Sequence, residues 1–464
     1  MPRFSRMISF VSVALLAGCV LLEPTNPYGP TNAYAPPAVA SEAAGAPAAD
    51  LPDEPLGLDR LVAIALSNNP TVAARRWGTD AADAARDAAR AEAFPHVSAV
   101  SGYTHSEDPM SISPPGPPFV VTRNVMSAGL VVRMPVFTGG RIVSQIQAAE
   151  LLEKAAAHRL ARTREELVFN VTSVYCRILA QRHVIESIRF SRQTLREHLD
   201  RVEALVAQEQ AAPVDRLRTE VRLADVAEQL VRARNLLEIQ KRTLVNLLGV
   251  KGPADGLEVA GELEPVGDEG PRPLEALFEA AFADRDDLLA ARRSLEAQAR
   301  RVDAARAAYW PDVFLQGTYG ADWDAADWHR SENVATVGVG VEVPLFEGGR
   351  IPARIREERS RLAADQEALR ELRLRIRLEV ETARLNLASA RERVEATRKA
   401  IEQGKEGLRI ERLKYRNAKA SITDVLDAQD DLLNAQTNYY HALADHHVAT
   451  AELKRAIGQE GAAE

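Results

Sequence analysis

An internal repeat constrains the fold of this chain more than any other feature of its sequence. The segment LDRLVAIALSNNPTVAARR begins at Leu58, and the similar segment LEALFEAAFADRDDLLAARR begins at Leu274, 216 residues later. Further along, MPVFTGGR in the first copy matches VPLFEGGR in the second at an offset of 209 residues, and this offset then stays constant. The sequence therefore predicts two copies of one unit, over residues 56–252 and 274–458, joined by a linker over 253–273.

Each copy is expected to contain two shorter helical segments, a pair of strands and two long helices. The strands are indicated by a period of two, since Val337, Val339 and Val341 alternate with glycine and polar residues. We place the strand pairs at about residues 96–133 and about 312–343, each pair around a loop. A soluble antiparallel hairpin packed on helices would show the same alternation and is the alternative.

The segments after the two GGR elements predict unusually long helices, at about residues 138–248 and about 347–457. No proline follows Pro352, and we expect one continuous helix over residues 350–419, a rod of ~105 Å at ~1.5 Å per residue. Its apolar residues recur every seven positions, with one four-residue step that the first copy shares, which indicates packed, supercoiled helices. A cytoskeletal coiled coil would show such helices too, but it needs neither strands nor an export signal.

The N-terminus reads as an export signal followed by a tether. Two arginines precede a short apolar run that ends in Leu-Ala-Gly-Cys, so residues 1–18 are predicted to be a lipoprotein signal peptide with Cys19 as the lipidated first residue. An ordinary signal peptide cut nearby is the alternative. Residues 19–55 are rich in proline and alanine and predict an extended tether, and residues 459–464 predict a C-terminal tail.

Charge and motif content exclude several functions. With 58 basic and 66 acidic residues the net charge is −8, which gives no support to a nucleic-acid partner. No nucleophile, phosphate-binding or zinc-protease motif occurs, so we expect no enzyme and no cofactor beyond the covalent lipid on Cys19. His441, His446 and His447 lack the spacing of a helical zinc site; we expect them to be solvated and predict no metal. Cys176, inside a long helix, is expected to be buried.

The number of strands constrains assembly if they cross a membrane. Two hairpins supply four strands, which cannot close alone, and unpaired backbone in hydrocarbon costs several kcal/mol per group. A trimer with twelve strands is the smallest assembly that leaves an open pore. Aromatic residues at the strand ends fit interfacial girdles; these are Tyr103, Phe314 and Tyr319, with Trp323 and Trp328 expected in the loop beyond.

The duplicated unit, the two PxFxGGR-type corners and the stretch YRNAKASITDVLDAQ from Tyr415 resemble TolC-type outer-membrane efflux channels, in particular their lipid-anchored members. The resemblance covers about residues 56–458. It implies a mainly α fold with a small transmembrane β part, in which a homotrimer forms a 12-stranded barrel continued by a periplasmic helical barrel. It further implies a Gram-negative outer-membrane location, contact with outer-membrane lipid, and a periplasmic adaptor and an inner-membrane pump as partners.

The same resemblance assigns candidate site residues. Asp424 and Asp427 match the acids that form a cation-selective ring at the periplasmic mouth of such channels, and Asp215 and Tyr415 match members of the gate network. A basic residue expected three to four positions before the DVLDA element is Ala420 here, with Lys419 beside it as the candidate replacement. The alternative is that these acids only favour the dipoles of the helices they begin.

The strand-to-helix corners are further candidate sites, at Pro135, Gly139 and Gly140 and at Pro344, Gly348 and Gly349. The leading function is a passive exit duct of a tripartite efflux or secretion system. The alternative is a lipid-anchored periplasmic adaptor or scaffold without channel activity, although such proteins do not normally carry duplicated long helices. The sequence does not predict the substrate, because selection occurs in the pump.

Overall fold

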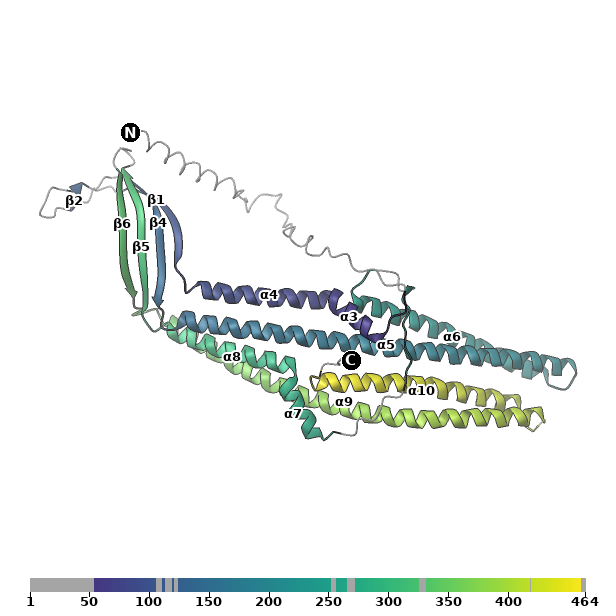
Figure 1. Cartoon of the computed structure of the whole chain (residues 1–464). Coiled ribbons are helices and arrows are strands. Elements are labelled where there is room, and N and C mark those ends of the chain that lie inside the picture. Colours follow the sequence, from purple (N-terminus) through teal and green to yellow (C-terminus); the bar gives the residue numbers. More distant parts are fainter. Residues whose placement is uncertain are drawn as a thin grey trace. The chain divides into compact units, whose positions relative to one another are not determined.

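The structure is a computed structural model that describes residues 54–105, 111–112, 119–120, 124–251, 256–264, 272–324, 331–417 and 419–459 (Figure 1). The predicted signal peptide, Cys19 and nearly all of the predicted tether lie outside the described residues, as does Trp328. Lipidation of Cys19 therefore stays a prediction.

The two copies contain the same elements in the same order. The first copy consists of α3 (Leu58–Asn68), α4 (Pro70–Ala91), β1 (His96–His105), β4 (Asn124–Phe137), α5 (Arg141–Ala207) and α6 (Pro213–Leu248). The second consists of α7 (Leu274–Asp284), α8 (Asp286–Ala307), β5 (Asp312–Asp324), β6 (Ser331–Glu342), α9 (Arg350–Arg416) and α10 (Ile422–Ala456). The long helices α5 and α9 both have 67 residues and begin 209 residues apart, which confirms the repeat.

Three details differ from the sequence-based expectation. The helix predicted over residues 350–419 ends at Arg416, so Lys419 lies in the turn that follows, because the chain must reverse before Ser421 begins the next helix. Trp323 lies inside β5, not in the loop beyond, since β5 pairs with β4 as far as Asp324. The loop of the first copy contains a short pairing of β2 (Ser111–Ile112) with β3 (Phe119–Val120).

The four long strands form one antiparallel sheet in the order β1-β4-β5-β6 (Figure 1). Because side chains alternate along each strand, residues in register share a face. One such row runs Val97, Val132, Gly317, Val337, and the next row on the opposite face runs His96, Arg133, Gln316, Gly338. The apolar row is exposed: Val337 is 91% exposed and Val97 is 64% exposed.

The seven-residue pattern predicted in α9 coincides with its buried seam. Ile355, Leu369, Ile376, Val380 and Val394 are all buried. These residues face the helices that pack along α9, chiefly α10 and α8, whereas most of its other residues are exposed. No helix in the described residues combines the length and the hydropathy that crossing a membrane would need.

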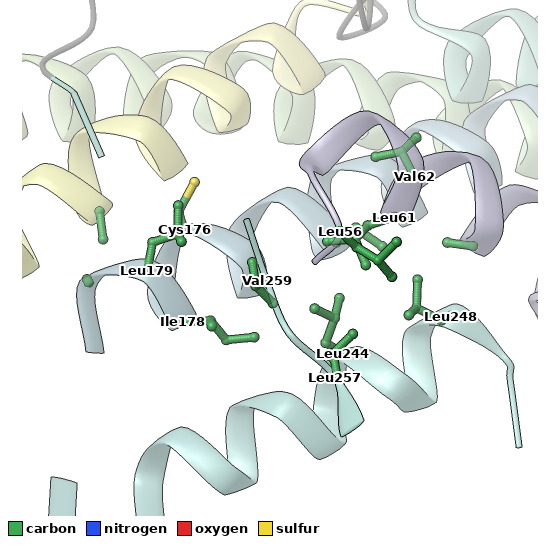
Figure 2. Close-up of a cluster of buried hydrophobic side chains, with 14 of the residues drawn as sticks. Leu56, Leu61, Val62, Cys176, Ile178, Leu179, Leu244, Leu248, Leu257 and Val259 are labelled. Carbon is green, nitrogen blue, oxygen red and sulfur yellow. The ribbon is translucent and has the colours of Figure 1, made fainter. Parts of the chain in front are cut away.

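The largest core cluster joins the start of the first copy to the segment between the copies (Figure 2). Leu56 pairs with Val259 in a parallel bridge, and Leu257 and Val259 are buried against α5 and α6. The Tyr175 hydroxyl donates to the Ala260 carbonyl at 2.7 Å. The described part of the predicted linker is therefore packed as part of the fold. The same cluster buries Cys176, as expected, and burial raises the pKa of its thiol to about 12.

Candidate functional site

Two equivalent turns connect the long helices and carry the candidate gate residues. In the first copy the Gln210 N–H donates to the Leu205 carbonyl at 2.8 Å, and in the second the Lys419 N–H donates to the Lys414 carbonyl at 2.9 Å. These donors and acceptors are each 209 residues apart, so the two turns have the same backbone plan. Different side chains are thus presented on one repeated scaffold.

The Asp424 side chain caps the start of α10. The Ser421 hydroxyl accepts a hydrogen bond from the Asp424 N–H, and the Asp424 carboxylate accepts bonds from the Ser421 N–H at 2.7 Å and hydroxyl at 2.8 Å. This capping box satisfies backbone donors that a helix start leaves free. These bonds from Ser421, the backbone one foremost, lower the pKa of the Asp424 carboxyl, and the charge of Lys414 contributes. Asp424 therefore does stabilise the start of its helix, as the alternative to the ring assignment predicts.

Asp427 is placed differently, because its carboxylate is exposed one turn into α10 and has no hydrogen bond or ion pair within the described residues. Its equivalent in the first copy is the base Arg218. The Arg218 guanidinium donates to the Thr423 hydroxyl at 3.0 Å and so joins α6 to the start of α10. At these two equivalent positions the second copy therefore has two acids, whereas the first copy has one acid, Asp215, and one base.

Asp215 and Tyr415 are brought together at the first turn, where both line one groove. Partial burial, reinforced by the negative charge of Asp215, raises the pKa of the Tyr415 phenol. Asp215 occupies the position of Asp424. Its helix begins at Pro213 and its N-cap residue is Ala212, which has no hydroxyl that could bond to Asp215. Lys419 is exposed, and within the described residues it makes no ion pair with these acids.

Sequence reasoning missed the side-chain contacts that join the two helical hairpins. Besides Arg218, Arg222 forms an ion pair with Asp430. The Gln429 amide nitrogen of α10 donates across to the Ser191 hydroxyl of α5 at 3.3 Å, while within the second hairpin the Arg412 guanidinium donates to the Gln429 amide oxygen at 2.8 Å. The sequence predicts a base three to four positions before the DVLDA element in the same copy, whereas Arg218 and Arg222 come from the other copy.

The strand-to-helix corners have the conformation that their glycines allow. Gly139 and Gly140 have φ of +60° and +87°, and Gly348 and Gly349 have φ of +60° and +84°. This left-handed backbone favours glycine over any residue with a Cβ. Pro135 lies at a register shift in β4, and Pro344 lies just beyond the end of β6.

The C-terminal histidines differ from expectation at one position. His446 is buried and not solvated, because it lies on the inner face of α10, while the imidazole of His447 lies 2.7 Å from the Glu264 carbonyl oxygen. In the part of the chain that the structure describes, no three His, Cys, Asp or Glu residues gather as a metal site would require.

Comparison with known proteins gives a consistent match. The family described as outer membrane efflux protein matches residues 61–250 and 277–459. The fusaric acid resistance protein FusA of Burkholderia cepacia is 30% identical over 141 residues, 29% of this chain and 26% of FusA. Outer membrane protein TolC of Vibrio cholerae is 23% identical over 402 residues, 85% of this chain and 89% of TolC. The crystal structure of outer membrane protein VceC from Vibrio cholerae shares the fold, with a TM-score of 0.74, 21% identity and coverage of 86% and 96%.

Proposed function

Because the chain belongs to the outer membrane efflux protein family, we propose that it is the outer-membrane channel of a tripartite efflux or secretion system. It is a passive duct that extends from the outer membrane into the periplasm. A periplasmic adaptor and an inner-membrane pump are its partners, and the pump supplies energy and selects substrate. The family is one of channels, and we assign no catalytic role to any residue. The adaptor alternative is not favoured.

The observation that carries this function is an incomplete sheet with one apolar face. Within the described residues, strands β1 and β6 each have one unpaired edge, and the apolar face that includes Val97 and Val337 is exposed. Lipid would solvate that face, and the opposite face, with Arg133 and Gln316, would line water. Closing the edges requires further copies of the chain, and three copies give a barrel of twelve strands.

The repeat shows how the copies would join. Within the chain β4 pairs with β5, and α5 packs against α8 and α10. The equivalent contacts of the second copy would pair β6 with a β1 and pack α9 against an α4 and an α6, yet the described elements of the chain make no comparable contacts. A neighbouring subunit supplies them if the two copies are quasi-equivalent around a ring. Three subunits of two copies then alternate as six similar units.

The test is conductance together with mass. Purified mature protein reconstituted in planar bilayers should form ion-conducting channels, and its mass in detergent should be that of a trimer. The intact mass of the chain also tests the lipid on Cys19, since an unmodified thiol would reject lipidation. A monomer that conducts nothing would refute the channel assignment and favour the scaffold alternative.

We assign the cation-selective ring to Asp424 and Asp427, with Asp215, Tyr415 and Lys419 as its gate network. Converging carboxylates raise the local concentration of cations and repel anions. Asp427 supports this assignment best, because its carboxylate is exposed and no side chain of the described residues neutralises it.

Asp427→Asn should therefore reduce cation preference in reversal-potential measurements without loosening the start of α10. Asp424→Asn is the matched variant; it should reduce cation preference and also speed amide hydrogen exchange over the first turn of α10, because it breaks the capping box with Ser421. If neither substitution changes ion selectivity, the ring assignment is wrong and Asp424 is only a helix cap.

A further inference from the structure

A basic groove lies between the two helical hairpins, next to the turn that joins α5 to α6. Its volume is 610 Å³. The charged and titratable residues that line it, besides Tyr415, are Glu197, His198, Arg201, Asp215, Arg412 and Arg416. Arg201 belongs to α5 of the first hairpin, and Arg412 and Arg416 belong to the last turns of α9 in the second. The groove thus places bases of both hairpins around one space.

The bases of the groove repel one another. Burial and then the nearby charges of Arg201 and Arg416 lower the pKa of Arg412, against which Glu197 acts in the opposite direction. Burial, followed by the charges of Arg201 and Arg412, lowers the pKa of the His198 imidazole to about 4. The imidazole is therefore neutral at pH 7, and it packs against the Tyr415 ring at 5.7 Å between centroids. Arg201 and Arg412 thus make the electrostatic potential at the imidazole positive.

The acids of the groove do not pair with these bases. The Glu197 carboxylate accepts a hydrogen bond from Gln193 at 3.0 Å, and Asp215 lies beside Tyr415. Within the described residues, Arg201 and Arg416 make no hydrogen bond or ion pair, and Arg412 has Gln429 as its partner. Two guanidinium groups on opposite hairpins are therefore free to donate.

The basic groove is not a by-product of the repeat. The positions equivalent to Arg201, Arg412 and Arg416 in the other copy are Ile410, Glu203 and Ala207. The two turns share one backbone conformation, and this conformation does not need these charges, because the equivalent turn forms without them. A role in folding alone would apply to both copies, so the charges point to a role specific to this groove.

We propose that the groove binds a multivalent oxyanion, a phosphate or polycarboxylate, which Arg201 and Arg416 clamp from the two hairpins. Guanidinium groups are suited to this because their planar donors match two oxygens at once. The bound anion joins α5 to α9 and so stabilises the arrangement of the hairpins seen here. Binding itself does not depend on the channel function, whereas its consequence, a change in how long the channel stays in each conducting state, rests on the proposed function.

Calorimetric titration of the purified full-length protein with inorganic phosphate, and separately with citrate, at constant ionic strength tests binding. We expect one anion per subunit and affinity weakened about tenfold or more in Arg201→Gln and in Arg416→Gln, since each removes a charged donor. Arg409→Gln is the matched control: it removes the same charge from α9, the helix of Arg416, but Arg409 pairs with Glu406 and lies outside the groove. Its affinity should equal that of the wild type.

The imidazole of His198 gives an independent readout. A bound oxyanion offsets the charges of Arg201 and Arg412, so the pKa of His198 in titrations followed by NMR should rise when phosphate is added. Single-channel open and closed dwell times should change with phosphate in the wild type and stay unchanged in Arg201→Gln. No binding by the wild type, or equal affinity in the Arg201→Gln, Arg416→Gln and Arg409→Gln variants, would overturn the proposal. A protein that binds phosphate but conducts nothing would instead refute the channel function.

Discussion

Gly139→Ala is expected to lower the free energy of unfolding by roughly 3 kcal/mol, about half from the left-handed backbone and about half from overpacking. Gly139 has φ of +60°, and a Cβ there would lie 2.5 Å from the Trp310 Cβ and 2.8 Å from the Ala307 carbonyl oxygen. Neither neighbour is the flexible end of a side chain. The neighbouring Gly140→Ala is the matched control, because its φ is +87° but its added Cβ meets no atom within 4 Å in the part of the chain that the structure describes, so only the backbone cost applies.

The equivalent corner makes this prediction a test of assembly. Gly348 has the same φ of +60°, yet no atom of the described residues lies within 4 Å of its added Cβ. Trp310 corresponds to Phe94 in the first copy, and Phe94 is 65% exposed. In a quasi-equivalent trimer a neighbouring subunit brings its Phe94 to Gly348, as Trp310 lies at Gly139.

Denaturant unfolding of the trimer, followed by helix circular dichroism, measures the three variants. We expect Gly348→Ala to cost about as much as Gly139→Ala, and both to cost more than Gly140→Ala by ~1–3 kcal/mol. If Gly348→Ala matches Gly140→Ala, the corner of the second copy stays open in the assembly. The ring of alternating copies would then be wrong.

The repeat explains how much of the fold the sequence could predict. Local backbone preferences are visible in the GGR elements, the seven-residue apolar pattern and the alternating valines. Because each pattern occurs in both copies, the prediction for one copy supports the prediction for the other. Helix ends were less predictable. The helix ending at Arg416 was placed three residues too long because no glycine or proline marks the turn before Ser421. The linker core at Leu257 was missed because its contacts lie far away in the sequence.

The candidate site was predictable only where residues act through local structure. Asp424 could be placed at a helix start from the Ser421 spacing, and the capping box confirms that local role. The contact of Arg218 with Thr423 joins residues 205 positions apart, and no pattern along one copy reveals it. The bases of the groove were missed for the same reason, since their proximity depends on how the two hairpins pack.

Arg285→Met is expected to destabilise the fold by ~3 kcal/mol, the lower end of the cost of breaking a buried ion pair, because its partners keep some contact with water. The Arg285 side chain is 1% exposed and donates to Asp287 at 2.6 Å, to Glu379 at 2.7 Å and to the Ala456 carbonyl at 3.1 Å. It therefore joins α8, α9 and α10. Methionine retains bulk but removes the guanidinium that donates to these two carboxylates and the carbonyl, and among the described residues only the Leu288 N–H still donates to Asp287.

Two matched variants separate the ion pair from its surroundings. The equivalent of Arg285 in the first copy is Asn69, whose amide donates to the Leu247 carbonyl, the equivalent of Ala456. Asn69→Ala should cost ~1–2 kcal/mol, since it removes this bond and the cap on the Thr71 N–H. Arg293→Met breaks an exposed pair with Glu296 and should cost at most ~0.5 kcal/mol. Equal costs in Arg285→Met and Arg293→Met would contradict the prediction.

The pH dependence of the destabilisation by Arg285→Met distinguishes a lost ion pair from a packing defect. Burial opposes ionisation of Asp287, but the hydrogen bonds and charge of Arg285 outweigh it and lower the pKa of the Asp287 carboxyl. A lowered pKa in the folded state stabilises the fold above the unfolded value, ~3.9, and this stabilisation is lost as pH falls through the folded value. The difference in unfolding free energy between wild type and Arg285→Met should therefore be largest near neutral pH and shrink below about pH 4. A difference that stays constant down to pH 3 would indicate lost packing and not a lost ion pair.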